Sequence, residues 1–221
     1  MSNIDSLLNK RCKDSKGTSA EHLYSEIEAL LKLHLNYSAT ILDLGAGIGN
    51  LKKFLAKNNS YKIEEADYTF SEKREMFHQL NLNELFDLQK KFDAITVVEV
   101  LHFMENPRHL MRQASLHLGD SGYVIVSIPN LHSLTSLLSL IFRGVHSAFA
   151  GKNYPAHITP LHKIDILRIL GELQMKNIQV YPSQLGRMPG LKCYWQRLFP
   201  GSRNLFINGV FSDNLIFIAK K

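Results

Sequence analysis

The most constraining feature of the sequence is a short apolar segment that ends in three closely spaced glycines. Residues 40–44 (TILDL) read as a buried strand, and Gly45, Gly47 and Gly49 follow and open a helical segment. Glycines at this place allow a tight turn and let a ligand approach the bare backbone. A strand, a glycine-rich turn and a helix in this order predict a nucleotide-type site in an α/β fold.

Strands and helices alternate along most of the chain. Helices are predicted from apolar residues at helical spacing, the first over about 20–35 with Ser19 as its N-cap. This alternation predicts an α/β fold with a mostly parallel sheet and helices on both faces, which binds its ligand beyond the carboxyl ends of the strands. The predicted strands cover 40–44, 61–66, 76–80, 92–98, 123–128, 177–181 and 214–219, and the further helices about 50–57, 106–117 and 163–174.

Length and composition fit one globular domain. The 221 residues are enough for a single large core, and no apolar run is long enough to cross a bilayer. The first residues do not resemble a signal peptide, and Cys12 and Cys193 are too few for a disulfide framework or a cysteine metal site. We therefore expect a cytoplasmic protein without a metal. The net charge of +6 is dispersed and identifies no partner.

The spacing of glycines and acids distinguishes between nucleotide ligands. The dinucleotide pattern is G-x-G-x-x-G, whereas here the third glycine comes one residue early, and no Lys-Ser/Thr pair follows as in a P-loop. Asp43 lies two residues before Gly45, where its carboxylate would repel a pyrophosphate but suit a ligand with an amino group and a sulfonium. Asp67, after the second predicted strand, can accept hydrogen bonds from ribose hydroxyls.

The segment from Asp43 to Gly49 (DLGAGIG) resembles motif I, D-x-G-x-G-x-G, of class I S-adenosylmethionine (SAM)-dependent methyltransferases. Residues 92–101, 119–130 and 157–161 are similar to later segments of that family, so the resemblance runs from about 37 to 182. It is strongest toward the small-molecule branch that includes ubiquinone-type O-methyltransferases. It implies a Rossmann-like seven-stranded sheet with the last strand antiparallel, and SAM as the cofactor.

The resemblance also implies roles for individual residues. Asp43 and Glu99 would lie at the methionine end of the cofactor, and Asp67 would bind the ribose. Tyr68 would lie against the adenine, and Asn81 would accept from the adenine amino group. The cofactor-binding residues implied in this way are Asp43, Gly45, Ala46, Gly47, Asp67, Tyr68, Asn81, Leu82 and Glu99.

Methyl transfer requires positioning of donor and acceptor and sometimes a base, for which histidine is best suited near neutral pH. His132, His157 and His162 fall near the predicted active edge, and His157 is the first choice because it precedes the helix that faces the cofactor in relatives. The Glu-His pair that relatives carry after the fourth strand is displaced here by one residue to His102-Phe103. This displacement argues against assigning to His102 the role that the histidine has in those relatives.

Two segments have no assigned role in this pattern. Residues 131–156 are predicted to form an apolar, lid-like insertion. It either packs over the site as part of the core, or acts as a lid that shapes an apolar substrate pocket or touches lipid. Residues 184–211 contain both aromatic and basic side chains. This composition fits a wall of the substrate pocket, a dimer interface or a packed connection between strands. We expect an N-terminal arm and helix over 1–36 and a methyltransferase domain over 37–221.

The sequence therefore predicts an enzyme that methylates a small molecule, with oxygen as the default acceptor atom. A nucleic-acid methyltransferase is the first alternative, but the fourth strand ends in Val98-Glu99-Val100 and no basic binding module is appended, so no nucleic-acid partner is expected. A non-catalytic SAM-binding protein is the second, and an NAD-dependent enzyme fits least. The sequence is compatible with peripheral membrane contact. It is also compatible with either a monomer or a homodimer.

Overall fold

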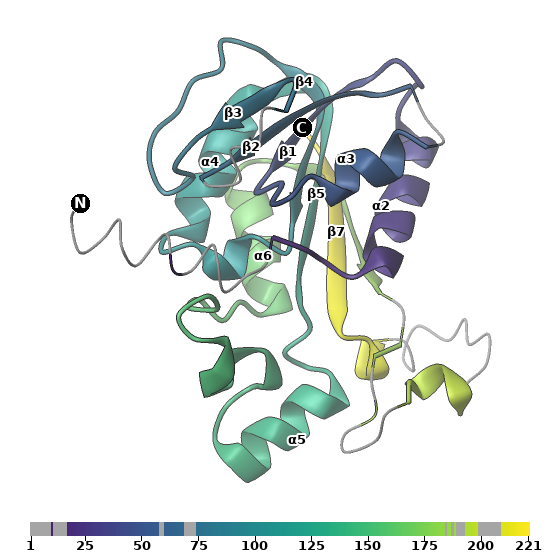
Figure 1. Ribbon diagram of the computed structural model, residues 1–221, viewed down its shortest axis with the longest axis vertical. Helices are drawn as coiled ribbons and strands as arrows, with labels where there is room; N and C mark the ends of the chain where they lie inside the picture. The colour runs from purple at the N-terminus through teal and green to yellow at the C-terminus, as the bar shows by residue number, and fades with distance from the viewer. Residues whose placement is uncertain are drawn as a thin grey trace.

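One seven-stranded sheet organises the protein (Figure 1). The computed structural model describes residues 10, 17–57, 60–68, 74–183, 185–186, 188, 193–198 and 209–221. The strand order is β3-β2-β1-β4-β5-β7-β6, with parallel pairing from β3 to β5, and β7 runs antiparallel to both of its neighbours. The predicted Rossmann-like sheet with its last strand antiparallel is thus confirmed. The strands are β1 (Thr40–Leu44), β2 (Lys62–Asp67), β3 (Phe77–Gln79), β4 (Phe92–Val98), β5 (Leu118–Pro129), β6 (Lys176–Pro182) and β7 (Asn214–Lys220).

Helices cover both faces of the sheet, as the alternation predicts (Figure 1). Within β1, Ile41 packs into the core on the α2 side and Leu42 into the core on the α4 side, and both are fully buried. A strand buried on both faces reads as a continuous apolar run, which is why residues 40–44 were recognisable. The helices on one face are α2 (Glu21–His34) and α3 (Asn50–Leu55), and those on the other are α4 (Pro107–His117) and α6 (Lys163–Glu172).

The predicted boundaries hold closely except at two places. β5 begins five residues earlier than the predicted 123, at Leu118. The prediction that Ser19 caps the first helix is wrong, because Ala20 is the N-cap of α2 and no side chain caps it. Instead, the backbone N–H of Ser19 donates to the hydroxyl of Tyr24 at 2.9 Å. The connection between β2 and β3 lies partly outside the described residues.

The insertion after β5 forms a lobe of its own. It contains α5 (Leu134–Arg143) and the short 3-10 turns η2 (Ser147–Phe149) and η3 (Gly151–Asn153). α5 lies beyond the carboxyl end of β5, away from both helical layers (Figure 1). In the described ranges, no helix has the length and apolar character that a membrane span requires. Two other 3-10 turns are η1 (Leu101–Phe103) and η4 (Trp195–Arg197).

Candidate functional site

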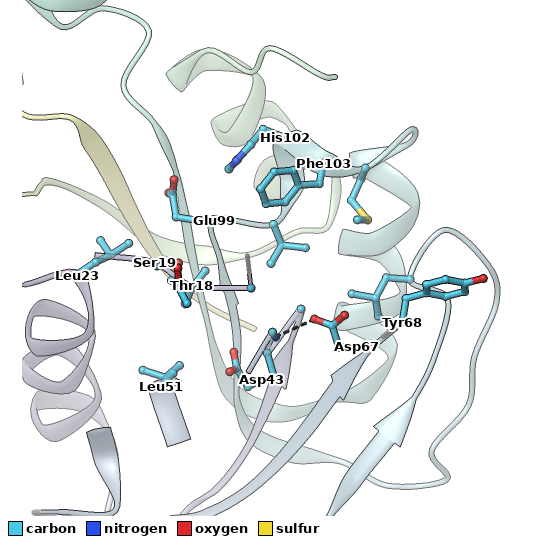
Figure 2. A pocket seen from close by; sticks show the side chains of 18 of the residues that line it. Thr18, Ser19, Leu23, Asp43, Leu51, Asp67, Tyr68, Glu99, His102 and Phe103 are labelled. Atoms are coloured by element: carbon cyan, nitrogen blue, oxygen red, sulfur yellow. Dashed lines mark hydrogen bonds between the residues drawn. The ribbon is translucent and has the colours of Figure 1, made fainter. Parts of the chain in front are cut away.

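A cavity of about 310 Å³ lies at the carboxyl ends of β1, β2 and β4 (Figure 2). This volume is at the lower end of the range of about 300–1,000 Å³ found for small-molecule sites. Asp43 and Asp67 lie on one side of the cavity, and His102 and Phe103 lie on the opposite side (Figure 2). The lining includes the preferred base His157 and every cofactor-binding residue that the resemblance implies, namely Asp43, Gly45, Ala46, Gly47, Asp67, Tyr68, Asn81, Leu82 and Glu99.

The glycine loop after β1 has a backbone that only glycine adopts easily. Gly45 has φ +79°, and a Cβ built there would lie 2.3 Å from a methyl carbon of Val100. Its N–H donates to the carbonyl of Ala66 in β2 at 2.8 Å, and the N–H of Gly47 donates to Oδ2 of Asp67 at 2.8 Å (Figure 2). The loop is therefore tied to β2 and turns bare backbone toward the cavity.

An ion pair that the sequence did not reveal supports the loop from outside. Arg74 donates from Nη2 to the carbonyl of Gly47 at 2.8 Å and pairs through Nη1 with Oε1 of the buried Glu65 at 3.0 Å. Its guanidinium also lies over the ring of Phe77, 4.3 Å from the centroid. A Cβ on Gly49 would approach Nη1 of Arg74 to 2.4 Å. The third glycine of the motif thus makes room for this pair.

A segment before α2 forms the wall beside the glycine loop. The carbonyl of Gly17 accepts the N–H of Ile48 at 3.1 Å, and it would lie 2.3 Å from a Cβ on Gly47. Thr18 and Ser19 follow it along the cavity (Figure 2). Sequence reasoning missed this wall, because a polar stretch before a helix carries no pattern that points to a distant loop.

Asp43 is buried, and opposing effects bring the pKa of its carboxyl group close to neutral pH. Burial raises the pKa of its carboxyl to about 7, and the negative charges of Glu65 and Asp67 act in the same direction. The hydroxyl of Thr96 opposes this shift by donating to Oδ1 at 2.7 Å, and the charge of Arg74 opposes it as well. A cation bound beside Asp43 would stabilise its carboxylate and lower that pKa.

Glu99 follows β4 in a backbone conformation unusual for a residue with a side chain, with φ +57°. Its N–H donates to the hydroxyl of Ser127 at 2.9 Å, and that hydroxyl donates to Oε1 of Glu99 at 2.9 Å. Burial raises the pKa of Glu99 to about 7, and hydrogen bonds from Ser127 and Asn214 oppose the shift. This pairing fixes the carboxyl at the cavity wall. Strain held in this way is typical of functional sites.

The residues expected near an adenine line the same cavity. Leu82 is buried, and Tyr68 follows Asp67 at the end of β2 (Figure 2). Asn81 lies in a local turn, where its oxygen accepts the N–H of Asn83 at 3.1 Å and its amide donates to Glu84 at 2.8 Å. The turn holds Asn81 in a fixed orientation at the cavity.

The charged groups of the lining are all acidic. Asp43, Asp67 and Glu99 contribute three carboxyl groups, and no lysine or arginine is among the described residues that line the cavity. The chain as a whole carries a net charge of +6. The cavity is therefore acidic although the chain as a whole is basic. An acidic cavity favours a ligand with positive charge over a pyrophosphate.

Two histidines meet at the other end of the cavity. The rings of His102 and His157 lie 4.5 Å apart between centroids, and the backbone carbonyl of His102 accepts the N–H of Ile158 at 3.0 Å. Burial lowers the pKa of both imidazoles, that of His102 well below 6.5, so both are neutral near pH 7. The Nδ1 atom of each is buried without a hydrogen-bond partner among the described residues. Such atoms call for a ligand or water.

The remaining sequence candidates lie elsewhere. His132 and His162 do not line the cavity; Nε2 of His132 and Nδ1 of His162 are 3.1 Å apart, and His162 is the N-cap of α6. Trp195 and Phe211 contact one another, with ring centroids 4.4 Å apart, whereas most of 184–211 lies outside the described residues. The described ranges contain no group of three or more His, Cys, Asp or Glu side chains that could hold a metal ion.

Comparison with protein-family models matches residues 19–180 to a methyltransferase domain. This match covers most of the residues that line the cavity and the whole insertion after β5. Comparison with curated protein sequences gives no match.

Solved structures with the same fold include proteins of more than one activity. A SAM-dependent methyltransferase from Archaeoglobus fulgidus is similar, with TM-score 0.58, 20% identity, and 90% of this chain and 94% of that chain covered. The complex between the Trm112 methyltransferase activator and a methyltransferase from Haloferax volcanii contains a similar chain, with TM-score 0.62, 12% identity, and coverage of 100% and 98%. The [4+2]-cyclase SpnF also matches, with TM-score 0.57, 13% identity, and coverage of 89% and 80%. At these identities the likeness concerns the fold.

Proposed function

Since the chain belongs to the methyltransferase domain family, we propose that it transfers a methyl group from SAM to a small acceptor, at a hydroxyl oxygen held by the histidine end of the cavity. SAM is the cofactor. The observation that carries the proposal is the cavity wall itself, with three carboxyl groups, bare glycine backbone, and no lysine or arginine among its described residues.

The residues present fit SAM. The cofactor carries a positive amino group and a positive sulfur, which the carboxylates of Asp43 and Glu99 would stabilise in a site shielded from water. Asp67 already accepts a backbone N–H through Oδ2, and its carboxylate is the group suited to ribose hydroxyls. Tyr68, Asn81 and Leu82 would hold the adenine. The absence of side chains at Gly45 and Gly47 leaves room for the methionine portion.

The histidine pair provides what an oxygen acceptor requires. When bound, SAM would supply an electrophilic methyl group, whose bond to sulfur breaks as the bond to oxygen forms, with the bonding electrons left on sulfur in a neutral thioether. His157 accepts the proton of the acceptor hydroxyl as the carbon–oxygen bond forms, and His102 orients that hydroxyl beside it. Because burial keeps both imidazoles neutral at pH 7, His157 is ready to act as a base without prior deprotonation. Phe103 and Met104 make the surrounding wall apolar.

The proposed organisation places the methyltransferase domain in residues 37–221. We propose residues 1–36 as an N-terminal arm and helix, of which the described part contributes the wall from Gly17 to Ser19 and the packing of α2. Deleting residues 1–19 would therefore open the cofactor end of the cavity rather than remove an unrelated extension.

The cofactor assignment is tested by removing the ribose acid. We expect Asp67→Ala to reduce SAM affinity by roughly a hundredfold, because a charge-assisted pair of hydrogen bonds is lost. Asp120→Ala is the matched control, since Asp120 is exposed and lines a different surface at the opposite end of β5. Calorimetric titration measures both variants, and circular dichroism checks their folding. Unchanged affinity in a folded Asp67→Ala protein would exclude the ribose assignment.

The acceptor is sought by incubating the protein with methyl-labelled SAM and a panel of phenols, sugars and other hydroxyl compounds. Labelled methyl ether products would support the proposal. Transfer to nitrogen or to nucleic acid alone would contradict it. Tight SAM binding with no transfer to any acceptor would favour the non-catalytic alternative.

A further inference from the structure

The helix α5 has its polar side buried and its apolar side exposed. The buried residues of α5 are Ser136 and Ser139. Ile141 and Phe142, by contrast, are 72% and 79% exposed, and Leu137 and Leu140 are exposed as well. A helix that packs as part of a core shows the opposite arrangement.

Specific contacts hold α5 in this orientation. The hydroxyl of Ser136 lies 2.9 Å from Nδ1 of His146, and the hydroxyl of Ser139 donates to the carbonyl of Val145 at 2.8 Å. The helix begins at Ser133, whose side chain caps it, and ends at Gly144 in a left-handed conformation. The exposed apolar side is therefore built into a well-terminated helix and is not a frayed end.

The segment that contains α5 carries positive charge and no acid. Residues 131–164 contain no aspartate or glutamate, and their three cations, Arg143, Lys152 and Lys163, are all exposed. Tyr154, also in this segment, is 67% exposed. Exposed apolar helix residues followed directly by Arg143, in a segment without acids, suit the boundary between headgroups and acyl chains of an anionic bilayer.

A second copy of the chain fits this surface less well. A two-fold dimer through α5 would place Arg143 of both copies in one interface, where no aspartate or glutamate of residues 131–164 could pair with it. Positive charge without an acidic partner across the interface disfavours such a pairing. An anionic lipid surface instead attracts this positive charge.

The position of α5 also suits docking. It projects beyond the carboxyl end of β5, clear of both helical layers (Figure 1). The same lobe packs against a residue that lines the cavity, since the ring centroid of Phe149 lies 5.7 Å from that of His157. A membrane bound at α5 would therefore lie on the side of the molecule where the histidine pair is located.

We propose that α5 and the cations of its segment make a docking surface for anionic lipid bilayers. This surface consists of Leu137, Leu140, Ile141, Phe142, Arg143 and Lys152. This proposal is independent of the methyl-transfer reaction, because it requires neither cofactor nor acceptor. Binding should combine insertion of the apolar side chains with charge attraction, and it should therefore weaken with added salt.

The test is flotation of the full chain with vesicles of phosphatidylcholine alone and of an equimolar mixture with phosphatidylglycerol. We expect binding to the mixed vesicles, a loss of at least about tenfold in the double variant Ile141→Ser/Phe142→Ser, and a loss of about fivefold in Arg143→Gln. The matched control is Leu33→Ser/Leu85→Ser, which removes two leucines that are 72% and 81% exposed on other surfaces.

The control should bind like the unmodified chain, and SAM binding should be the same in all variants. The proposal is overturned if the unmodified chain does not float with anionic vesicles, or if the double variant floats equally well. Light scattering that shows a dimer in the unmodified chain and a monomer in the double variant, without vesicle binding, would instead assign the surface to self-association.

Discussion

The two ends of the cavity are built in different ways. The cofactor end consists of strand ends and the glycine loop, where backbone hydrogen bonds and buried carboxyl groups fix each position. The proposed acceptor end consists of η1 and the segment after α5, where His102 and His157 approach from distant parts of the chain. Under the proposed function, this difference means that the fold would determine how the cofactor is held, whereas the connections between elements would determine what it reacts with.

The largest expected effect is at the cofactor end. Gly45→Ala should abolish detectable SAM binding, because φ +79° and the methyl carbon of Val100 at 2.3 Å force the loop to move. Stability should fall by about 1–3 kcal/mol for the strained backbone. Gly171→Ala is the control: a Cβ at this exposed position in α6 meets nothing within 4 Å, so we expect a gain of about 0.8–1 kcal/mol and normal binding. Calorimetry and thermal unfolding measure both, and normal SAM binding by Gly45→Ala would break the comparison.

The acceptor end is tested by separating binding from transfer. His157→Gln should reduce the rate of methyl transfer by about 10²–10⁴, the usual contribution of a general base, and leave SAM affinity within about twofold. His132→Gln, outside the cavity, should leave both unchanged. Single-turnover measurements with saturating SAM give the rate. An unchanged rate of methyl transfer in His157→Gln would exclude His157 as the general base.

The two ends should also differ in their response to pH. Asp43 and Glu99 have pKa values of about 7 without a ligand, and a bound cation requires their ionised forms. Affinity for SAM should therefore rise as pH rises through 7, by roughly tenfold per group between about pH 6 and 8. The transfer rate in the bound complex should stay flat above about pH 6.5, because burial lowers the pKa of His157. Affinity that is constant from pH 6 to 8 would contradict the electrostatic account.

A conservative variant sharpens this prediction. Thr96 donates to Asp43 and opposes the rise in its pKa, so Thr96→Val should move the midpoint of SAM binding to higher pH without changing the rate of transfer at saturation. Titrations at several pH values measure the shift. A midpoint that does not move would mean that Asp43 is not the titrating group.

Most of the fold and the cofactor end could be predicted from the sequence because their signals are local. β4 covers Phe92–Val98, the same residues that β-branched composition indicates. The expected cofactor residues all line one cavity, since each lies at or soon after the carboxyl end of a parallel strand and these ends meet at one edge of the sheet. Their roles toward SAM stay predictions that the variants above test.

What the sequence did not reveal depends on contacts between distant segments. Arg74 supports Gly47, 27 positions earlier, and His102 meets His157 although relatives carry their histidine one residue away. No spacing rule relates these residues, because loop conformations bring them together. The apolar character of 131–156 was evident, but its outward orientation follows from hydrogen bonds of Ser136 and Ser139 that no periodicity encodes.

The most direct test of the central claim, that an acid-lined cavity receives a cationic cofactor, is calorimetric titration of the unmodified chain with SAM and with NAD under the same conditions. The account predicts one SAM bound per chain, with affinity rising from pH 6 to 8, and no measurable binding of NAD. Binding of NAD in preference to SAM, or no binding of SAM at any pH, would contradict it.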